Sequence, residues 1–220
     1  MGRASEATKV IQLETTKRKT IVLKAIWMTD LHFAHQIEIL GHNPRKRLGN
    51  AIDHVNQLHS DADFCVVSGD LVNRGTAADY NALSGRLESL SVPILPMMGN
   101  HDNRQLLKEF LPLPSTCMDE FVQYSVTTPE GLILCMDTHK LGSDAGELCE
   151  TRLAWLESQL KQSSGLPVFI FMHHPPIALG LPTQDADKLI NGDQFLDLIS
   201  NFDCVNTYSS DMFTAQFLGL

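Results

Sequence analysis

The sequence predicts an α/β domain, because short apolar runs alternate with amphipathic runs along most of its 220 residues. The apolar runs predict strands at residues 21–29, 64–68, 94–98, 122–126, 132–136 and 168–172. The amphipathic runs predict helices at residues 45–59, 77–90, 104–110, 150–162 and 192–200.

The order of these elements predicts how the strands pair. The first part of the chain runs strand, helix, strand, helix, strand, which predicts a largely parallel first sheet. The fourth and fifth strands are joined through Pro129, Glu130 and Gly131, and this spacing predicts a hairpin. No repeat or linker divides the chain. We therefore expect one domain over residues 21–205, preceded by a polar leader at residues 1–20 that lacks the apolar stretch of a secretory signal.

Composition and charge limit the function. Seventeen Lys and Arg residues against 26 Asp and Glu residues give a net charge of -9, which disfavours a nucleic acid polymer as a partner. No apolar run approaches the roughly 18 residues that would cross a bilayer, so we expect no membrane partner. Five widely spaced cysteines without a CxxC pair predict a reduced, cytoplasmic compartment. A phosphorylated substrate must then be small or be attracted by a local positive charge.

Polar side chains follow four of the predicted strands. Asp30 and His32 follow the first strand and Asp70 the second, and two further groups lie at residues 99–102 and 173–174. Ligands of open α/β sheets bind at the carboxyl ends of the strands, so we expect these side chains to share one crevice. The remaining histidines are predicted to be surface or packing residues: His35, His42, His54, His59 and His139.

These residue types suit a divalent metal ion. Alternation along an extended strand end would place Asp30 and His32 on the same side, within reach of one cation. Mixed nitrogen and oxygen ligands favour manganese, iron, zinc or cobalt over calcium. The adjacent His173 and His174 should point to opposite sides of their strand, so only one of them should be a ligand.

Four motifs in this order resemble the calcineurin-like metallophosphoesterase family. They are DxH at Asp30–His32, GD at Gly69–Asp70, GNHD at Gly99–Asp102 and HHPP at His173–Pro176. The stretches VVSGDLVNRGTAADY and FMHHPPIALG resemble, more narrowly, its class III cyclic nucleotide phosphodiesterase and glycerophosphodiesterase branch. The resemblance implies a four-layer αββα sandwich with two divalent metal ions (Fe, Mn, Zn or Co) between the sheets. It implies that Asp30 and His32 bind the first metal, that Asp70 bridges both, and that Asn100 and His173 bind the second.

The implied reaction is hydrolysis of a small phosphodiester, either a 3',5'-cyclic nucleotide such as cAMP or a glycerophosphodiester. Two metals can generate a hydroxide nucleophile and clamp the phosphate. We expect His101 to be catalytic, with Asp102 orienting its ring. We expect the substrate to contact four of the motif residues: His32, Asp70, Asn100 and His101. Arg74 lies in a stretch similar to that of protein Ser/Thr phosphatases, but Asn73 replaces an Asp of that stretch. A protein phosphatase is therefore a weaker alternative. A nuclease is a second weaker alternative, because the chain is acidic. The sequence leaves homo-oligomerisation open.

One block of the family is missing. Relatives carry GHxH after a further strand, and its histidines complete both metal sites, whereas the residues after Val205 are polar and without strand periodicity. The codons permitted for residues 206–217, read from their third base, allow an apolar strand followed by Gly-His-Val-His. We therefore hypothesise a single-base frameshift that makes residues 206–220 an aberrant tail and leaves the second sheet incomplete. The alternative function is an inactive, metal-deficient remnant or interaction scaffold.

Overall fold

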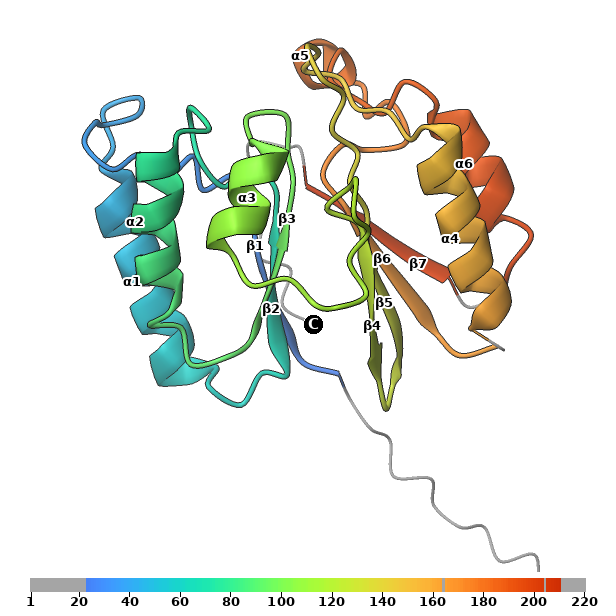
Figure 1. The fold of residues 1–220 in the computed structure, drawn as a ribbon, viewed down its shortest axis with the longest axis horizontal. Helices are drawn as coiled ribbons and strands as arrows, with labels where there is room; N and C mark the ends of the chain where they lie inside the picture. Colours follow the sequence, from blue (N-terminus) through green and yellow to red (C-terminus); the bar gives the residue numbers. More distant parts are fainter. Residues whose placement is uncertain (1–22, 164, 204, 211–220) are drawn as a thin grey trace, which may run out of the picture.

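The computed structural model describes residues 23–163, 165–203 and 205–210 and shows four layers (Figure 1). Two sheets face each other, and helices cover the outer side of each sheet. Side chains from both sheets meet in one apolar core that includes Val67, Met97, Ile133 and Phe171. The predicted αββα sandwich is confirmed.

The first sheet is parallel, as predicted. It contains β1 (Ala25–Met28), β2 (Phe64–Ser68) and β3 (Ile94–Met97) in that order. The helices that follow these strands are α1 (Pro44–Leu58), α2 (Ala77–Leu87) and α3 (Arg104–Phe110). Asn43, Thr76 and Asn103 precede the three helices, and each side chain accepts a backbone N–H from the first turn, which fixes where the helix begins.

The second sheet is mixed. Its order is β4 (Tyr124–Thr128), β5 (Gly131–Cys135), β6 (Val168–Met172) and β7 (Val205–Ser209). The hairpin of β4 and β5 is confirmed as antiparallel, and the other pairs are parallel. Its first strand begins two residues later than predicted, because the Val122 N–H donates to the Asp137 carboxylate instead of joining the ladder. Two helices on the outer side, α4 (Glu150–Gln162) and α6 (Gly192–Ile199), and the short α5 (Pro182–Asp185) complete this half.

The expectation that no strand follows Val205 is wrong. Residues Val205–Ser209 form β7, with Tyr208 opposite Phe171 in a parallel ladder. The two rings stack with centroids 4.9 Å apart, and the Tyr208 ring also meets Trp27 edge-on at 6.1 Å. These aromatic contacts and the backbone ladder hold a strand whose sequence is otherwise largely polar. The predicted boundary at Asn206 therefore falls inside a strand. The predicted leader and residues 211–220 lie outside the described residues, and the frameshift stays a prediction.

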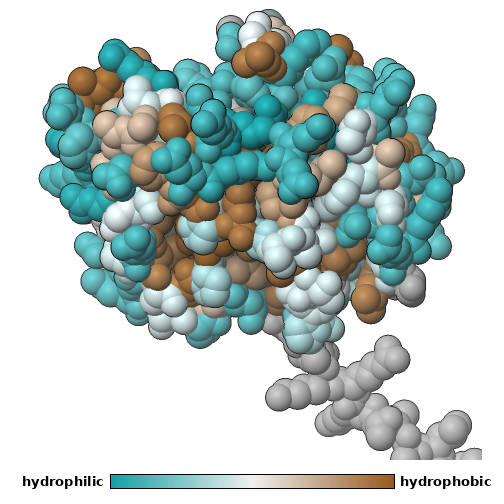
Figure 2. Space-filling model, in the orientation of Figure 1, coloured by the Kyte–Doolittle hydropathy of each residue, from teal (hydrophilic) through white to brown (hydrophobic). Residues whose placement is uncertain are grey.

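The surface is mostly hydrophilic over the outer helices in the view of Figure 2. Hydrophobic side chains show near the loop before α1, where Leu40 is exposed, and near α5, where Leu179 and Leu181 are exposed. No helix among the described residues is long and apolar enough to span a bilayer.

Candidate metal centre

The loops after β1 and β2 run side by side and carry the first three predicted ligands. The Asp30 N–H donates to the Gly69 carbonyl at 3.2 Å, and the His32 N–H donates to the Asp70 carbonyl at 2.8 Å. The φ angles of Asp30, His32 and Asp70 are 51°, 38° and 48°, so the backbone of all three residues lies in the left-handed region. The expected extended alternation of Asp30 and His32 is therefore wrong. Left-handed backbone at non-glycine residues is sparsely populated and concentrates at functional sites.

Two glycines let these loops approach closely. Gly69 has a φ of 101°, and a Cβ atom added there would lie 2.6 Å from Nδ1 of His173. A Cβ atom on Gly99 would lie 2.2 Å from Oδ1 of Asp70. Both distances are too short for real contacts, so a side chain at either position would push the candidate metal ligands apart.

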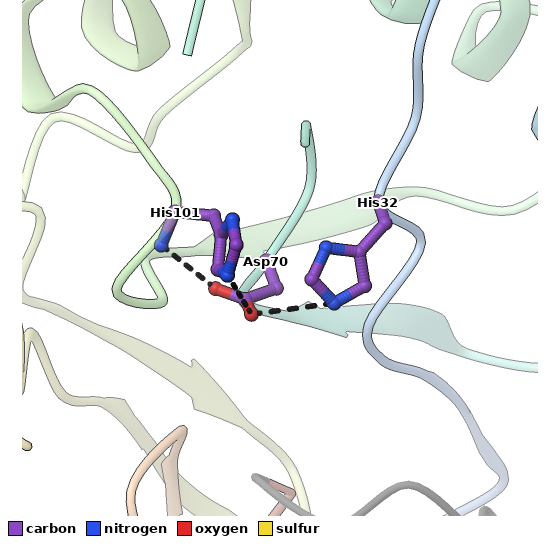
Figure 3. Close-up of side chains that lie close together, drawn as sticks. All are labelled: His32, Asp70 and His101. Atoms are coloured by element: carbon purple, nitrogen blue, oxygen red, sulfur yellow. Dashed lines mark hydrogen bonds and ion pairs between the residues drawn. The ribbon is translucent and has the colours of Figure 1, made fainter. Parts of the chain in front are cut away.

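The carboxylate of Asp70 lies at the centre of the cluster. Figure 3 shows the rings of His32 and His101 pointing toward it. Its Oδ2 is 3.5 Å from His32 Nε2 and 4.0 Å from His101 Nε2, whereas its Oδ1 is 3.5 Å from His173 Nε2. Each carboxylate oxygen therefore faces a different set of ligands, which is the arrangement that a bridging ligand requires.

The structure brings the predicted metal ligands together in two groups that share Asp70. The ligand atoms of His32, Asp70 and His101 lie within 4.8 Å of one another, and so do those of Asp30, Asp70 and His173. Oδ1 of Asn100 is 3.3 Å from His173 Nε2, which places it in the second group. Asp30 is thus grouped with His173, and its assignment to one ion with His32 stays a prediction.

The geometry of these groups fits metal ions. Separations of 3.5–4.0 Å between imidazole nitrogens and carboxylate oxygens exceed ordinary hydrogen-bond lengths. Two ligand atoms on one zinc-like ion are roughly 3.0–3.5 Å apart, because each lies about 2.1 Å from it. The Nδ1–H of His173 donates to the Ser68 carbonyl at 2.9 Å, which leaves the lone pair of its Nε2 facing Asp70. Burial is the main cause that lowers the pKa of His32, so this imidazole is neutral and able to bind a cation.

His101 lies at the open side of the first group. Its backbone N–H donates to Asp70 Oδ1 at 3.0 Å, and its ring Nδ1 lies 3.1 Å from the Asn73 carbonyl. A carbonyl only accepts, so Nδ1 carries a proton and Nε2 is the nitrogen that faces the cluster. The side chain is 40% exposed, which makes Nε2 accessible to a substrate.

Asp102 does not orient the ring of His101, so that prediction is wrong. Its buried carboxylate accepts backbone N–H groups from Gly99, Leu71 and Val72 at 2.9, 3.2 and 3.3 Å. It also accepts the Tyr80 hydroxyl at 2.8 Å. Burial and then the Asp70 charge raise its pKa to about 6. Asp102 instead ties the loop that carries Asp70 to the loop that carries Asn100.

His174 is a structural residue. Its Nδ1 lies 2.7 Å from Thr138 Oγ1, and its Nε2 lies 3.0 Å from the Asp144 carbonyl, so both ring nitrogens are bonded away from the metal centre. The expectation that only one of the two adjacent histidines faces the cluster is confirmed. Arg74 is exposed in its turn.

Sequence reasoning missed the groups that orient the ligands. The carbonyls of Ser68 and Asn73 fix the tautomers of His173 and His101, but a backbone carbonyl has no sequence signal. Ser210 was also missed. Its N–H donates to the His173 carbonyl at 3.0 Å and its Oγ to the Ser68 carbonyl at 2.9 Å, so the end of β7 lies beside the second ligand group.

Comparisons with known proteins agree with this geometry. Residues 23–205 match the family model for the calcineurin-like phosphoesterase. A probable cyclic nucleotide phosphodiesterase of Rhodopseudomonas palustris is 35% identical, over 81% of this chain and 66% of that protein. The glycerophosphodiester phosphodiesterase GpdQ of Enterobacter lignolyticus is 34% identical, over 80% of this chain and 65% of that protein. The chain spans slightly less than two thirds of the length of these two curated relatives.

Solved structures share the fold. A dimetal phosphatase from Danio rerio superposes with a TM-score of 0.66 and 16% identity, covering 84% of this chain and 79% of that one. A purple acid phosphatase from yellow lupin (Lupinus luteus) seeds superposes with a TM-score of 0.61 and 15% identity, covering 84% of this chain and 37% of that one. At these identities the likeness supports the architecture alone.

Proposed function

This chain belongs to the calcineurin-like phosphoesterase family, whose members are hydrolases with a dinuclear metal centre, and on that premise we propose that it hydrolyses small phosphodiesters. The proposed substrates are 3',5'-cyclic nucleotides such as cAMP, or glycerophosphodiesters. The names of the two relatives that are 35% and 34% identical support these two classes.

The observation that carries the proposal is the position of Asp70. One of its oxygens faces His32 and His101, and the other faces His173. A single carboxylate that serves two ligand groups supports a centre of two ions rather than one.

Five residues would hold the two ions: Asp30, His32, Asp70, Asn100 and His173. When bound, the ions supply a water-derived nucleophile at neutral pH and neutralise the charge on the phosphoryl oxygens. They also provide the local positive charge that a chain of net charge -9 lacks. Iron, manganese, zinc and cobalt all suit this set of nitrogen and oxygen ligands.

His101 would supply the proton for the leaving alkoxide. Its Nδ1–H donates to the Asn73 carbonyl, and this contact is retained when Nε2 is also protonated. A protonated Nε2 at the exposed side of the group can then donate to the leaving oxygen, and such acid catalysis is typically worth about 10²- to 10⁴-fold in rate. The phosphoryl group would contact His32, Asp70, Asn100 and His101.

The small size of the proposed substrate agrees with the charge of the chain. A net charge of -9 repels a nucleic acid polymer at long range, whereas a single phosphodiester needs only the local charge of the two ions. We further propose a cytoplasmic location, which the free thiols of Cys65, Cys117, Cys135 and Cys149 support.

The test combines metal analysis with hydrolysis. The purified chain is loaded with Mn²⁺, dialysed and analysed for bound metal, and then assayed with bis(p-nitrophenyl) phosphate, cAMP and a glycerophosphodiester. We expect two ions per chain and metal-dependent turnover. We expect His101→Ala to keep the bound metal but to lose about 10²- to 10⁴-fold in turnover.

The exposed His42, which lies outside both ligand groups, provides the matched control. His42→Ala should retain metal content and rate. A chain that binds no metal, or that binds two ions without hydrolysing any of the three diesters, would contradict the proposal and support the inactive remnant instead.

A further inference from the structure

His139 lies in the loop after β5, where its backbone is fixed on both sides. Its N–H donates to Asp137 Oδ1 at 3.1 Å, and its carbonyl accepts a hydrogen bond from Nη1 of Arg152 at 3.1 Å. The same Arg152 nitrogen donates to the Asp137 carbonyl at 2.6 Å. This loop therefore holds His139 in one place.

The loop is also anchored to the first sheet. Asp137 is completely buried, and its carboxylate accepts hydrogen bonds from Nε and Nη2 of Arg104 at 2.8 and 3.1 Å. Arg104 begins α3, immediately after the GNHD motif and Asn103. A charge-assisted bidentate pair of this kind is strong and directional. It fixes the loop of His139 relative to His101.

The ring of His139 is not a satisfied packing side chain. The residue is 9% exposed, and its Nδ1 is enclosed without a hydrogen-bond partner among the described residues. Most buried side-chain polar atoms have a hydrogen-bond partner, and a buried polar atom without one lowers the stability of the fold. The protein therefore leaves the hydrogen-bonding capacity of this imidazole incompletely used, which makes the ring a candidate to bind a ligand.

His139 lies on the same side of the second sheet as His173, because β5 pairs in parallel with β6 and the loops after these two strands leave the same edge. Its pKa is lowered, mainly by burial and then by Arg104, and the Asp70 carboxylate acts in the opposite direction. The imidazole is therefore neutral and can donate one hydrogen bond and accept another. His139 belongs to neither ligand group, so it does not compete for the metal ions.

We propose that His139 binds the alcohol portion of the diester, through a hydrogen bond between its imidazole and a hydroxyl or ester oxygen of that portion. The inference rests on the proposed phosphodiesterase function and assigns this residue to the substrate's non-phosphoryl part. The ligand chemistry is a hydroxyl-bearing alcohol, which glycerol and ribose share. His139 is then a positioning residue that acts on substrate affinity.

Product binding provides the sharpest test. Dissociation constants of glycerol 3-phosphate, AMP and inorganic phosphate are measured by calorimetry on the Mn²⁺-loaded chain and on His139→Phe, which keeps an aromatic ring but has no nitrogen. We expect one of the two esters to bind the unmutated chain more tightly than inorganic phosphate and so to identify the alcohol. His139→Phe should weaken the binding of that ester by about 3- to 10-fold, which corresponds to the loss of one hydrogen bond. The dissociation constant of inorganic phosphate should stay within about twofold.

Two further variants separate a contact from a packing effect. His139→Gln retains a donor and an acceptor and should recover part of the lost affinity, whereas His42→Ala should change nothing. In hydrolysis, His139→Phe should raise KM for the matching diester with little change in kcat or bound metal. The inference is overturned if His139→Phe weakens the binding of the ester and of inorganic phosphate equally, or weakens neither. If the chain hydrolyses no diester, the proposed function fails, while the comparison of ester with inorganic phosphate still decides the role of His139.

Discussion

The two halves of the metal centre differ in how deeply they are buried. In the first group, the side chains of His32 and His101 are 19% and 40% exposed. In the second group, His173 is completely buried. The difference follows from the fold, since His32 and His101 lie on loops, whereas His173 follows β6 inside the sandwich and is held by the Ser68 carbonyl.

The difference separates two roles. A substrate approaches through the exposed half, so we expect His32 and His101 to act on the phosphoryl group and the leaving oxygen. The buried His173 lies in a region of lower effective dielectric and is fixed by a backbone contact, so we expect it to hold an ion in a defined place. We therefore expect substitutions in the exposed half to change mainly the rate, and those in the buried half to change the stability as well.

The largest effect should come from Asp70, because it belongs to both halves. Asp70→Asn removes the charge that both ligand groups share, and we expect the loss of both ions. Turnover should fall by more than about 10³-fold, since even one preorganised electrostatic group is worth about 10²- to 10³-fold. Metal analysis and diester hydrolysis measure the two losses. The exposed Asp53 offers a control, and Asp53→Asn should keep both ions. Retention of one ion by Asp70→Asn would show that the halves bind metal independently.

The second prediction compares the halves directly. His173→Ala and His32→Ala should each reduce metal binding, but their effects on the free energy of unfolding of the metal-free chain should differ. His173→Ala leaves a cavity and removes the hydrogen bond to the Ser68 carbonyl, which should cost about 2–4 kcal/mol. His32→Ala should cost less than about 1 kcal/mol, because its side chain reaches solvent. Urea unfolding in the presence of a chelator measures both. Equal costs would mean that burial does not distinguish the halves.

The sequence predicts side chains better than it predicts the backbone that carries them. Carboxylates and imidazoles at strand ends were identified because residue type and strand position are both visible in a sequence. The left-handed backbone of Asp30 and His32 could not be predicted from the sequence, since it depends on hydrogen bonds to the neighbouring loop. The strand β7 was missed for a similar reason, because its stability comes from the ladder with β6 and the stacking of Tyr208.

Asp102 shows the same limit within a motif. Its place next to His101 suggested a role for its side chain on that ring. In the fold the carboxylate turns toward three backbone N–H groups of the loops after β2 and β3. Adjacent residues in a motif can thus serve different parts of the site, and only the hydrogen bonds distinguish the two roles.

The third prediction concerns the link that Asp102 makes between the loops after β2 and β3. Asp102→Asn replaces one accepting oxygen by an amide that donates, so at least one N–H of Gly99, Leu71 or Val72 loses its partner. We expect a loss of about 1–3 kcal/mol in unfolding free energy. Turnover should fall by about tenfold or more, because outer contacts that fix metal ligands are typically worth 10- to 100-fold. Denaturant unfolding and diester hydrolysis measure these effects. A changed pH profile of turnover with unchanged stability would instead support the orienting role on His101.

The smallest effect should come from Tyr80, which reaches Asp102 from α2. Its hydroxyl donates to Asp102 Oδ1 at 2.8 Å and accepts the Asn103 N–H at 3.0 Å, just before α3 begins. Tyr80→Phe keeps the buried ring and removes both bonds, so we expect a loss of about 1–2 kcal/mol with bound metal unchanged. Because Asp102 retains its three N–H donors, turnover should change by less than about threefold. The double variant Tyr80→Phe, Asp102→Asn should lose less unfolding free energy than the two single variants lose together, since the two residues share one hydrogen bond. Strict additivity in unfolding experiments would mean that this hydrogen bond contributes nothing. The tie between the loops after β2 and β3 would then rest on the hydrogen bonds from the backbone N–H groups alone.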